Sequence, residues 1–263
     1  MPQALLTNSI DSDVSPKHRV GYFVSHLKSL FYSGLESPRR IYRRTIAQYV
    51  EKAQRVLDIG CGYKAPDLET LHTSSSVLNV GTDIVGGLCP AGAPSVRFVE
   101  ADCRLLPFPD STFELVVCRD VIEHLEDPLP VFREVARLLT PGGAFVFLTP
   151  NRWDYVSLGA STVPNYMHGK IVLRLTGRDE EETFPTLFRA NSARRIRSLA
   201  VRSGLQVAQI ALLREHPHYL KINSFTYMIG IAFEQGVQRM LKSIRPYILG
   251  VCQRDPVSNI DLT

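Results

Sequence analysis

The sequence has little cysteine, only one tryptophan and no strong excess of charge of either sign. Its five cysteines are odd in number and none pairs with another at Cys-x-x-Cys spacing, so a disulfide framework is not indicated. Cys118 and Cys252 instead lie inside apolar runs, where reduced cysteine serves as a packing residue. This usage is typical of an intracellular protein.

Long apolar runs are also missing. No uncharged stretch approaches the length of about 18 residues that a membrane-spanning helix requires. Residues 1–15 are polar and acidic, and they lack the basic and then apolar order of a secretory signal. The formal charge of +4 and the pI near 8.8 are mild beside the dense basic surface that nucleic-acid binding usually shows. We therefore expect a cytoplasmic protein that does not bind DNA.

The 263 residues, of which 44% are hydrophobic, are enough to form one large domain. Ser37 and Pro38 read as the N-cap and first position of the second of two N-terminal helices. We divide the single domain into a disordered lead (1–16), N-terminal cap helices (17–51), a core (52–150), an inserted segment (151–190) and a C-terminal part (191–263).

The second helix carries a basic cluster of Arg39, Arg40, Arg43 and Arg44. One interpretation is a solvated face of a surface helix. The other is that an arginine of this cluster contacts the carboxylate of a ligand or of an acidic substrate.

The stretch 55–64, Arg-Val-Leu-Asp-Ile-Gly-Cys-Gly-Tyr-Lys, organises the rest of the sequence. Val56–Ile59 is a short apolar run of the kind that forms a buried parallel strand. Gly60 and Gly62 then allow a sharp turn and a close approach of a ligand to the backbone. A helix beginning near Ala65 would direct its free N–H groups to the same place. The pattern indicates a nucleotide pocket, although a Gly-x-Gly turn alone is weak evidence.

Two acids follow the next two predicted strands. The apolar run 76–81 precedes Asp83, and the strand 96–100 precedes Asp102. A carboxylate about 20 residues beyond the glycine turn can accept two hydrogen bonds from a ribose diol. Asp83 alone also fits a turn-forming residue. Two acids that leave one edge of the sheet in succession suggest a ribose contact and a contact with an exocyclic amine.

Strands and helices alternate through most of the remaining sequence. The predicted strands are 112–118, 144–148, 205–213 and 247–253, and the predicted helices are 131–139, 193–203 and 224–244. This order predicts an α/β fold with a Rossmann-like, doubly wound and mostly parallel sheet, and a ligand at the carboxyl edge of that sheet.

With these motifs in place, residues 50–150 resemble the class I S-adenosylmethionine-dependent methyltransferases. More narrowly, they resemble the small-molecule group that includes the ubiquinone-biosynthesis enzymes. The resemblance rests on Val56–Gly62, Asp83, 102–108, 113–118 and Glu123-His124-Leu125. It implies a seven-stranded sheet with an antiparallel last strand, and S-adenosyl-L-methionine as cofactor.

The resemblance also implies which residues contact the cofactor. They are Asp58, Gly60, Cys61 and Gly62 at the methionine part, Asp83 and Ile84 at the ribose, Asp102 and Cys103 at the adenine, and Arg119 in the backbone stretch that closes the methionine end. Lys64 stands where the family often has a third glycine, so the course of the turn is open.

A dinucleotide fingerprint is the rival interpretation of the same turn, because Gly60-x-Gly62-x-x-Ala65 also fits an NAD-dependent dehydrogenase. Asp58 would crowd a pyrophosphate, and Asp102 stands where adenine specificity is expected. Both acids favour the methyltransferase.

We interpret residues 151–190 as a lid over the acceptor, with Trp153, Tyr155 and Tyr166 as substrate-binding residues. The alternative is a plain connection with a small core of its own. A lid with aromatic side chains suits a small apolar or aromatic molecule, since it excludes water during the transfer. The helix at 224–244 is apolar at its start, which indicates core packing, with a homodimer contact or a membrane-surface contact as alternatives.

Methyl transfer is an in-line displacement that requires alignment of two centres and removal of the acceptor's proton. His124 and His168 are the candidate bases, because imidazole titrates near neutral pH. His124 fits a structural histidine equally well. Asp120, Glu123 and His124 could together hold a divalent ion, but the reaction requires no metal.

The predicted function is methyl transfer to a small, largely apolar acceptor, at oxygen in preference to carbon or nitrogen. The alternative from another class is a binding subunit that keeps the fold without activity. RNA methylation is less favoured, because no Asn-Pro-Pro-Tyr-like tetrad follows the fourth strand, although two arginine-rich helices could meet phosphates.

Overall fold

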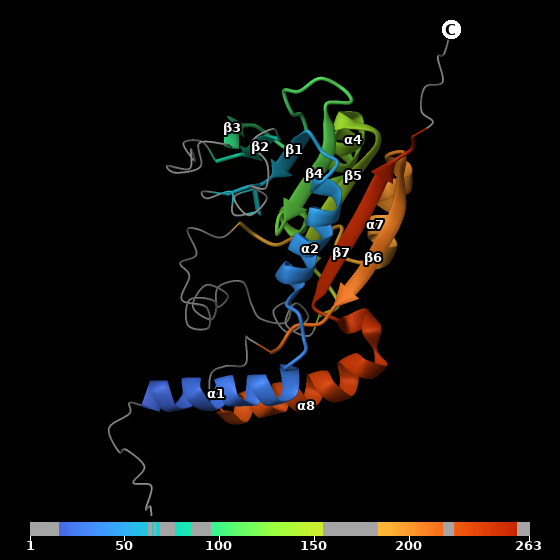
Figure 1. The fold of residues 1–263 in the computed structure, drawn as a ribbon. Helices are drawn as coiled ribbons and strands as arrows, with labels where there is room; N and C mark the ends of the chain where they lie inside the picture. Colours follow the sequence, from blue (N-terminus) through green and yellow to red (C-terminus); the bar gives the residue numbers. More distant parts are fainter. Residues whose placement is uncertain are drawn as a thin grey trace, which may run out of the picture.

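The computed structural model of the chain describes residues 16–62, 65, 67–68, 77–85, 96–154, 184–217 and 224–256. They form one seven-stranded sheet with the order β3-β2-β1-β4-β5-β7-β6 (Figure 1). The strands are β1 (Arg55–Ile59), β2 (Leu78–Asp83), β3 (Val96–Glu100), β4 (Phe113–Arg119), β5 (Leu139–Pro150), β6 (Leu205–Leu213) and β7 (Tyr247–Arg254). β1 to β5 are parallel, and β7 is antiparallel to both β5 and β6. The predicted Rossmann-like fold class is confirmed.

Helices cover both faces of this sheet, which explains why its strands are apolar on both sides. The helices are α1 (Pro16–Tyr32), α2 (Pro38–Val50), α4 (Pro128–Leu138), α7 (Ala193–Arg202) and α8 (Ser224–Met240), with 3-10 turns η1 (Ile122–His124) and η4 (Lys242–Ile244). In β1, Val56 belongs to the same apolar cluster as Tyr42 of α2. The next residue, Leu57, belongs to the cluster of Phe132 in α4 and Ile196 in α7. Successive residues of a strand point to opposite faces, so both clusters draw on every central strand.

Local sequence signals set the helix ends. Ser37, Asp127 and Ser192 each cap a helix by accepting a hydrogen bond from a backbone N–H of its first turn. Proline follows Ser37 and Asp127, and it lacks the N–H that a first turn leaves unpaired. Gly204, at φ +76°, lets the chain leave α7 and enter β6. The predicted cap at Ser37 is confirmed.

Two predicted strand boundaries are wrong, in each case because strand pairing continues further than the apolar run. β2 extends to Asp83, which pairs with Glu100 of β3. β5 begins at Leu139, which pairs with Phe113 before a register irregularity in β4. The predicted helix 224–244 ends at Met240, and η4 follows it. Residues 1–15 of the predicted lead lie outside the described residues.

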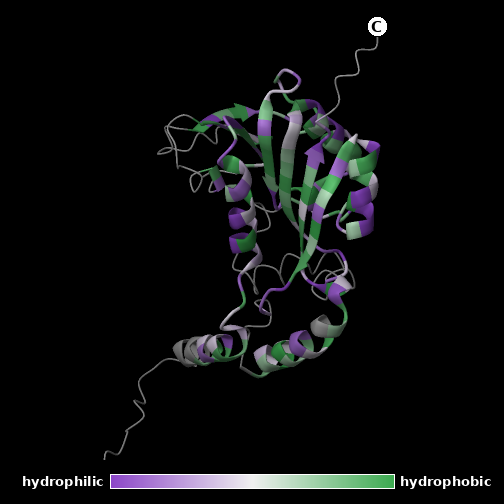
Figure 2. Cartoon of the chain, turned by 45° about the vertical axis from the view of Figure 1, so that its right-hand side comes forward, coloured by the Kyte–Doolittle hydropathy of each residue, from purple (hydrophilic) through white to green (hydrophobic). Residues whose placement is uncertain are grey.

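α1 and α8 form a separate pair of helices beyond the carboxyl ends of the parallel strands (Figures 1 and 2). The Tyr32 hydroxyl donates to the buried Glu234 carboxylate at 2.8 Å. The prediction that α8 packs in the core is wrong for one of its sides, since Phe225 is 71% exposed and Ile229 is 53% exposed. None of the helices in the described ranges has the length and hydropathy needed to span a bilayer. α1 and α8 share a small apolar core, which consists of Val24, Leu27, Tyr32, Tyr227 and Ile231.

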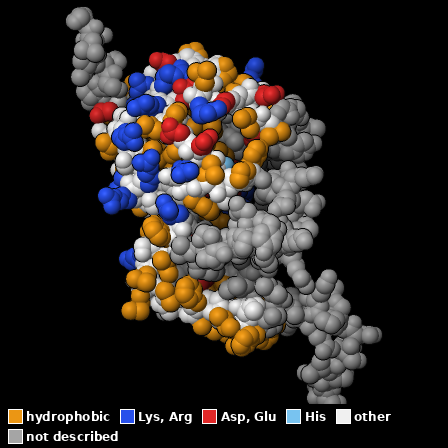
Figure 3. All heavy atoms as spheres, turned by 180° about the vertical axis from the view of Figure 1, so that it is seen from behind, with side chains coloured by type: hydrophobic (Ala, Val, Ile, Leu, Met, Phe, Trp, Pro, Cys, Tyr) orange, Lys and Arg blue, Asp and Glu red, His pale blue; other side chains and the backbone are white. Residues whose placement is uncertain are grey.

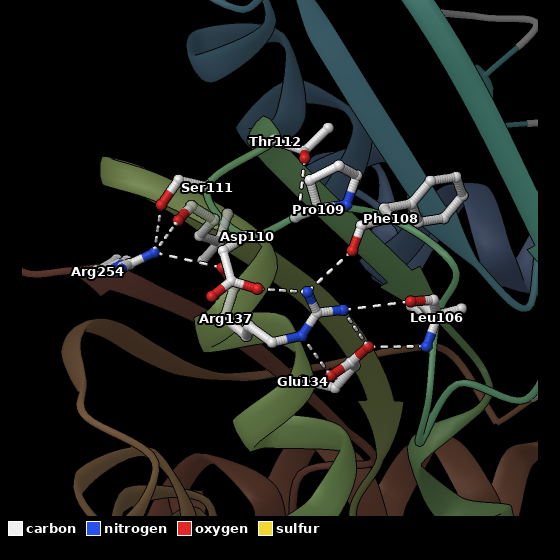
Figure 4. Close-up of polar contacts among 10 residues, drawn as sticks. Leu106, Phe108, Pro109, Asp110, Ser111, Thr112, Glu134, Arg137 and Arg254 are labelled. Atoms are coloured by element: carbon white, nitrogen blue, oxygen red, sulfur yellow. Dashed lines mark hydrogen bonds and ion pairs between the residues drawn. The ribbon is translucent and has the colours of Figure 1, made fainter.

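A polar cluster holds the loop between β3 and β4 at the opposite end of the sheet (Figure 4). Arg137 donates to Glu134, to Asp110 and to the carbonyl oxygens of Leu106 and Phe108 at 2.6–3.2 Å. The buried Glu134 carboxylate also accepts the Leu106 N–H at 2.7 Å. The Arg137 guanidinium keeps the pKa of Glu134 below its usual value. The cluster ties the loop to the end of α4.

Gly250 of β7 pairs with Phe147 of β5, and a Cβ at this glycine would lie 2.1 Å from the phenyl ring. Gly250→Ala should therefore lower the free energy of unfolding by about 1–3 kcal/mol, because the ring is packed inside the core. Gly236→Ala in α8 is the matched control, since a Cβ there meets nothing within 4 Å. It should be neutral or slightly stabilising, as alanine favours a helix. Urea denaturation followed by circular dichroism measures both, and wild-type stability of Gly250→Ala would contradict this packing.

Candidate active site

The turn after β1 is built on two residues in the left-handed region, Gly60 at φ +69° and Gly62 at φ +63°. The N–H groups of Gly60 and Cys61 donate to the Thr82 carbonyl at 2.7 and 3.1 Å, which binds the turn to β2. A Cβ on Gly60 would lie 2.2 Å from the side chain of Val121, whereas one on Gly62 would meet no described atom within 4 Å. The turn is therefore closed at Gly60 and open at Gly62, where a ligand can approach.

Asp83 ends β2 beside this turn and is followed by the exposed Ile84. Its Oδ2 accepts the Gly62 N–H at 3.0 Å, and its Oδ1 accepts the Val85 N–H at 3.2 Å. An ionised carboxylate has about four acceptor positions, so Asp83 can still accept hydrogen bonds from a vicinal diol. The arrangement of Gly62 and Asp83 fits the ribose of a nucleoside cofactor.

Asp102 lies near Asp83, because the Ala101 N–H donates to the Asp83 carbonyl at 2.9 Å. Arg104 binds the Asp102 carboxylate through Nε at 3.0 Å and Nη2 at 2.6 Å and lowers its pKa. An adenine amine would have to share this carboxylate with Arg104. Arg104 was not predicted as a site residue, although an arginine two residues after an aspartate can be seen in the sequence. Burial raises the pKa of the Cys103 thiol to about 11, so Cys103 stays neutral here.

Buried acids lie behind the glycine turn. Asp58 and Asp67 are both almost inaccessible to solvent. Arg119 Nε donates to Asp67 at 2.6 Å, and Arg43 of α2 lies 3.5 Å from the other Asp67 oxygen. Burial raises the pKa of Asp58 well above its usual value, and the Asp67 charge adds to this while Arg119 opposes it. A cationic group of a ligand would stabilise the ionised form of such a carboxylate.

Asp120 follows β4 at φ +57°, a conformation that few residues other than glycine adopt. Its N–H donates to the Leu148 carbonyl at 3.0 Å, and its carboxylate lies 3.5 Å from Arg39 and 3.7 Å from Arg119. The solvated-face interpretation of the α2 arginines is therefore incomplete. All four have acidic neighbours: Arg39 has Asp120, Arg43 has Asp67, and Arg40 and Arg44 have Glu36.

A hydrogen-bonded chain links η1 to the end of β5 and to the segment that returns from the insertion. The buried Glu123 carboxylate accepts from the Thr149 hydroxyl at 2.9 Å, and the hydroxyl accepts from the Asn191 amide at 2.6 Å. The N–H groups of Leu187 and Phe188 donate to the Glu123 carbonyl at 2.7 and 3.1 Å. Burial raises the pKa of Glu123 to about 7. Thr149 and Asn191 were not predicted as site residues from the sequence.

His124 Nδ1 lies 3.0 Å from the Pro185 carbonyl oxygen. A carbonyl only accepts, so Nδ1 carries a hydrogen, and in the neutral ring this contact leaves the lone pair on Nε2. Nε2 lies 4.0 Å from the Glu123 carboxylate. Asp120, Glu123 and His124 were considered for a divalent ion. Asp120 lies beside two arginines, Glu123 accepts from Thr149, and His124 contacts the Pro185 carbonyl. Within the described ranges, no group of three or more His, Cys, Asp or Glu side chains is placed to hold a metal ion.

The structure describes only the ends of the inserted segment. Trp153 is about half exposed, and the guanidinium of Arg152 lies 5.1 Å from the centre of its ring. Tyr155, Tyr166 and His168 lie outside the described residues, so their roles stay predictions.

Comparison with known proteins identifies the class. Residues 57–147 match a family described as a methyltransferase domain. The chain is 32% identical over 106 residues to a phosphoethanolamine N-methyltransferase of Triticum aestivum, covering 36% of this chain and 20% of the relative. It is 32% identical over 114 residues to a fatty-acid O-methyltransferase of Mycolicibacterium smegmatis, covering 41% of each. The chain thus spans less than half the length of these relatives.

A solved structure with the same fold is the geranyl diphosphate C-methyltransferase from Streptomyces coelicolor A3(2), crystallised with Mg²⁺, geranyl diphosphate and S-adenosyl-L-homocysteine. Its TM-score is 0.56 at 15% sequence identity, and the match covers 95% of this chain and 90% of that one. The sheet order and the family match identify the fold as that of a class I S-adenosylmethionine-dependent methyltransferase. More particularly, the relatives are of the small-molecule type, with different acceptors and acceptor atoms. The predicted family and its cofactor, S-adenosyl-L-methionine, are confirmed.

The raised pKa of Glu123 makes stability depend on pH. The folded value of about 7 lies above the usual 4.5, so the folded state keeps a proton that the unfolded chain loses between these values. Wild-type stability should therefore fall as pH rises from about 4.5 through about 7. Glu123→Gln keeps an acceptor for Thr149 and removes this loss, so it should exceed the wild type by roughly 1–3 kcal/mol at pH 8 and equal it near pH 4.

Urea denaturation at a series of pH values measures this difference. Glu126→Gln, an exposed neighbour, is the control and should follow the wild-type profile. Parallel profiles for Glu123→Gln and the wild type would show that burial does not perturb Glu123.

Proposed function

We propose that this protein transfers a methyl group from S-adenosyl-L-methionine to a small, largely apolar or aromatic acceptor, at oxygen. The observation that carries the proposal is the 3.0 Å contact between the Gly62 N–H and the Asp83 carboxylate. It places a bare backbone beside an acid that still has acceptor positions for ribose hydroxyls.

Three acids at the carboxyl edge suit three parts of the cofactor. Asp83 would accept hydrogen bonds from the ribose, and Asp102 would accept one from the adenine amine while sharing its carboxylate with Arg104. Asp58, whose pKa is raised by burial, would be stabilised by the positive charge of the methionine part. When bound, the cofactor supplies an electrophilic methyl group on a sulfonium.

The residues of the chain would align the acceptor, exclude water and remove a proton. His124 Nε2 would take the proton from the acceptor, since it holds the lone pair. The Pro185 carbonyl fixes the ring and its tautomer through Nδ1, and Phe184 lies against the ring with 6.1 Å between centroids. Glu123, at 4.0 Å, would stabilise the imidazolium that forms when the Glu123 carboxyl is itself ionised, which its pKa of about 7 allows at neutral to alkaline pH.

The acceptor is proposed from the inserted segment and from the base. The half-exposed Trp153 and the predicted residues Tyr155 and Tyr166 suit an apolar or aromatic molecule. Oxygen is favoured because a hydroxyl must lose its proton on methylation, which a histidine can accept. A cytoplasmic site of action belongs to the same proposal and agrees with the free thiols among the described residues, Cys61, Cys103, Cys118 and Cys252.

Asp83→Ala tests the cofactor site. It removes a charged acceptor of two ribose hydrogen bonds, so affinity for S-adenosyl-L-homocysteine should fall roughly a hundredfold. Isothermal titration calorimetry measures this, with the exposed acid Glu51 at the end of α2 replaced in the control Glu51→Ala. Equal affinity in the wild type and Asp83→Ala would place the ligand elsewhere.

His124→Ala tests the base. Transfer of labelled methyl groups to an organic extract of cells should fall about 10²–10⁴-fold between pH 6 and 9, because the variant lacks the proposed general base. Affinity for S-adenosyl-L-homocysteine should not change. Wild-type turnover in His124→Ala would exclude His124 as base. A wild type that binds the homocysteine product but methylates nothing would favour the inactive binding subunit.

A further inference from the structure

One side of α8 presents a continuous apolar stripe to solvent, at the lower end of the face shown in Figure 3. Phe225, Ile229 and Met240 are 71%, 53% and 84% exposed. We call this stripe the apolar face of α8. It consists of Phe225, Met228, Ile229, Ala232, Gly236 and Met240, which recur at the spacing of one helical face.

The opposite side of α8 packs against α1. Tyr227 and Ile231 are buried against α1, and Glu234 accepts the hydrogen bond from Tyr32. A surface helix normally directs its apolar side inward and its polar side to water. In α8 the outer side is also apolar, and an exposed patch of large apolar side chains marks a site of interaction.

Charge indicates what covers the apolar face. The sequence of α1 contains no acid, and the only acid in α8 is the buried Glu234. Cations are present in the same pair of helices and just beyond it: Lys28 is exposed on α1, and Lys242 is exposed just after α8. Among the described residues of α1, α8 and η4, the exposed charges are therefore cationic and none is a carboxylate.

This charge pattern favours a lipid surface over a second copy of the chain. A two-fold dimer through the stripe would bring the same patch against itself, and the exposed charges that the described part of α1, α8 and η4 could bring together are all cations. An anionic bilayer surface would instead attract the cations and accept the phenylalanine, isoleucine and methionine side chains. We propose that the apolar face of α8 binds the surface of an anionic lipid bilayer, with the helix lying in the plane of the interface.

The position of α8 gives this surface a consequence for the active site. α1 and α8 lie beyond the carboxyl ends of the parallel strands, the end of the sheet at which Asp83, Asp102 and His124 stand (Figure 1). A bilayer bound there would offer its lipophilic molecules at that end. This link to the acceptor rests on the proposed function, whereas binding to lipid does not, so vesicle binding without cofactor separates the two.

The test is co-sedimentation of the full chain with vesicles of phosphatidylcholine and phosphatidylglycerol, and with vesicles of phosphatidylcholine alone. The wild type should pellet with the anionic vesicles and less with the neutral ones, and added salt should weaken the binding. Phe225→Asp combined with Ile229→Asp should lower the partition coefficient at least about tenfold, because two large side chains lose their apolar contact. Val201→Asp is the control, since Val201 is a helical residue of α7 that is 73% exposed. It should bind like the wild type.

Circular dichroism confirms that the variants fold, and Met240→Asp alone provides a second variant should the double one unfold. Failure of the wild type to pellet with anionic vesicles would overturn the proposal. So would equal binding by the wild type and the folded variants. A dimer in light scattering that these variants convert to a monomer would assign the face to a second copy and also overturn it.

Discussion

The turn after β1 is the constraint on which the rest of the site depends. Gly60 must adopt a positive φ with its α-carbon beneath Val121, where a side chain has no room. The Thr82 carbonyl then binds two N–H groups of the turn, and Asp83 binds a third. The pairing of β1 with β2 therefore fixes the distance between the open backbone at Gly62 and the acid of the next strand. The geometry of the proposed cofactor site therefore depends on the sheet register and on the conformation of the glycine turn.

Several carboxylates lie buried or half-buried at the same edge of the sheet, and without cationic partners they would destabilise the fold. Asp58 and Asp120 lie at the carboxyl ends of β1 and β4, Asp67 lies behind the glycine turn, and the compensating charges come from Arg119 and from α2. α2 precedes the segment that matches the methyltransferase family, residues 57–147, yet its arginines belong electrostatically to the site. Removing α2 would take Arg43 away from Asp67 and Arg39 away from Asp120, and would leave Arg119 as their remaining ion-pair partner among the described residues.

Much of this could be predicted from the sequence, because it depends on local signals. The alternation of apolar residues, the glycine turn and the acids at strand ends predicted the sheet, its carboxyl edge and the neighbourhood of Gly62 and Asp83. Contacts between distant side chains could not be predicted. The bond from Arg119 to Asp67 and the chain from Asn191 through Thr149 to Glu123 join residues whose separation in sequence gives no sign of contact. The α8 helix was predictable from its spacing, but apolar residues on two sides do not tell which side is covered.

The central claim is that the carboxyl edge of β1 to β4 binds S-adenosylmethionine. A crystal structure of the chain grown with S-adenosyl-L-homocysteine tests it most directly. The account predicts ribose hydroxyls within hydrogen-bond distance of Asp83, adenine beside Asp102 with Arg104 sharing or leaving that carboxylate, and the amino acid part above Gly62 near Asp58. A ligand bound at another surface, or at this edge with its ribose away from Asp83, would contradict the account.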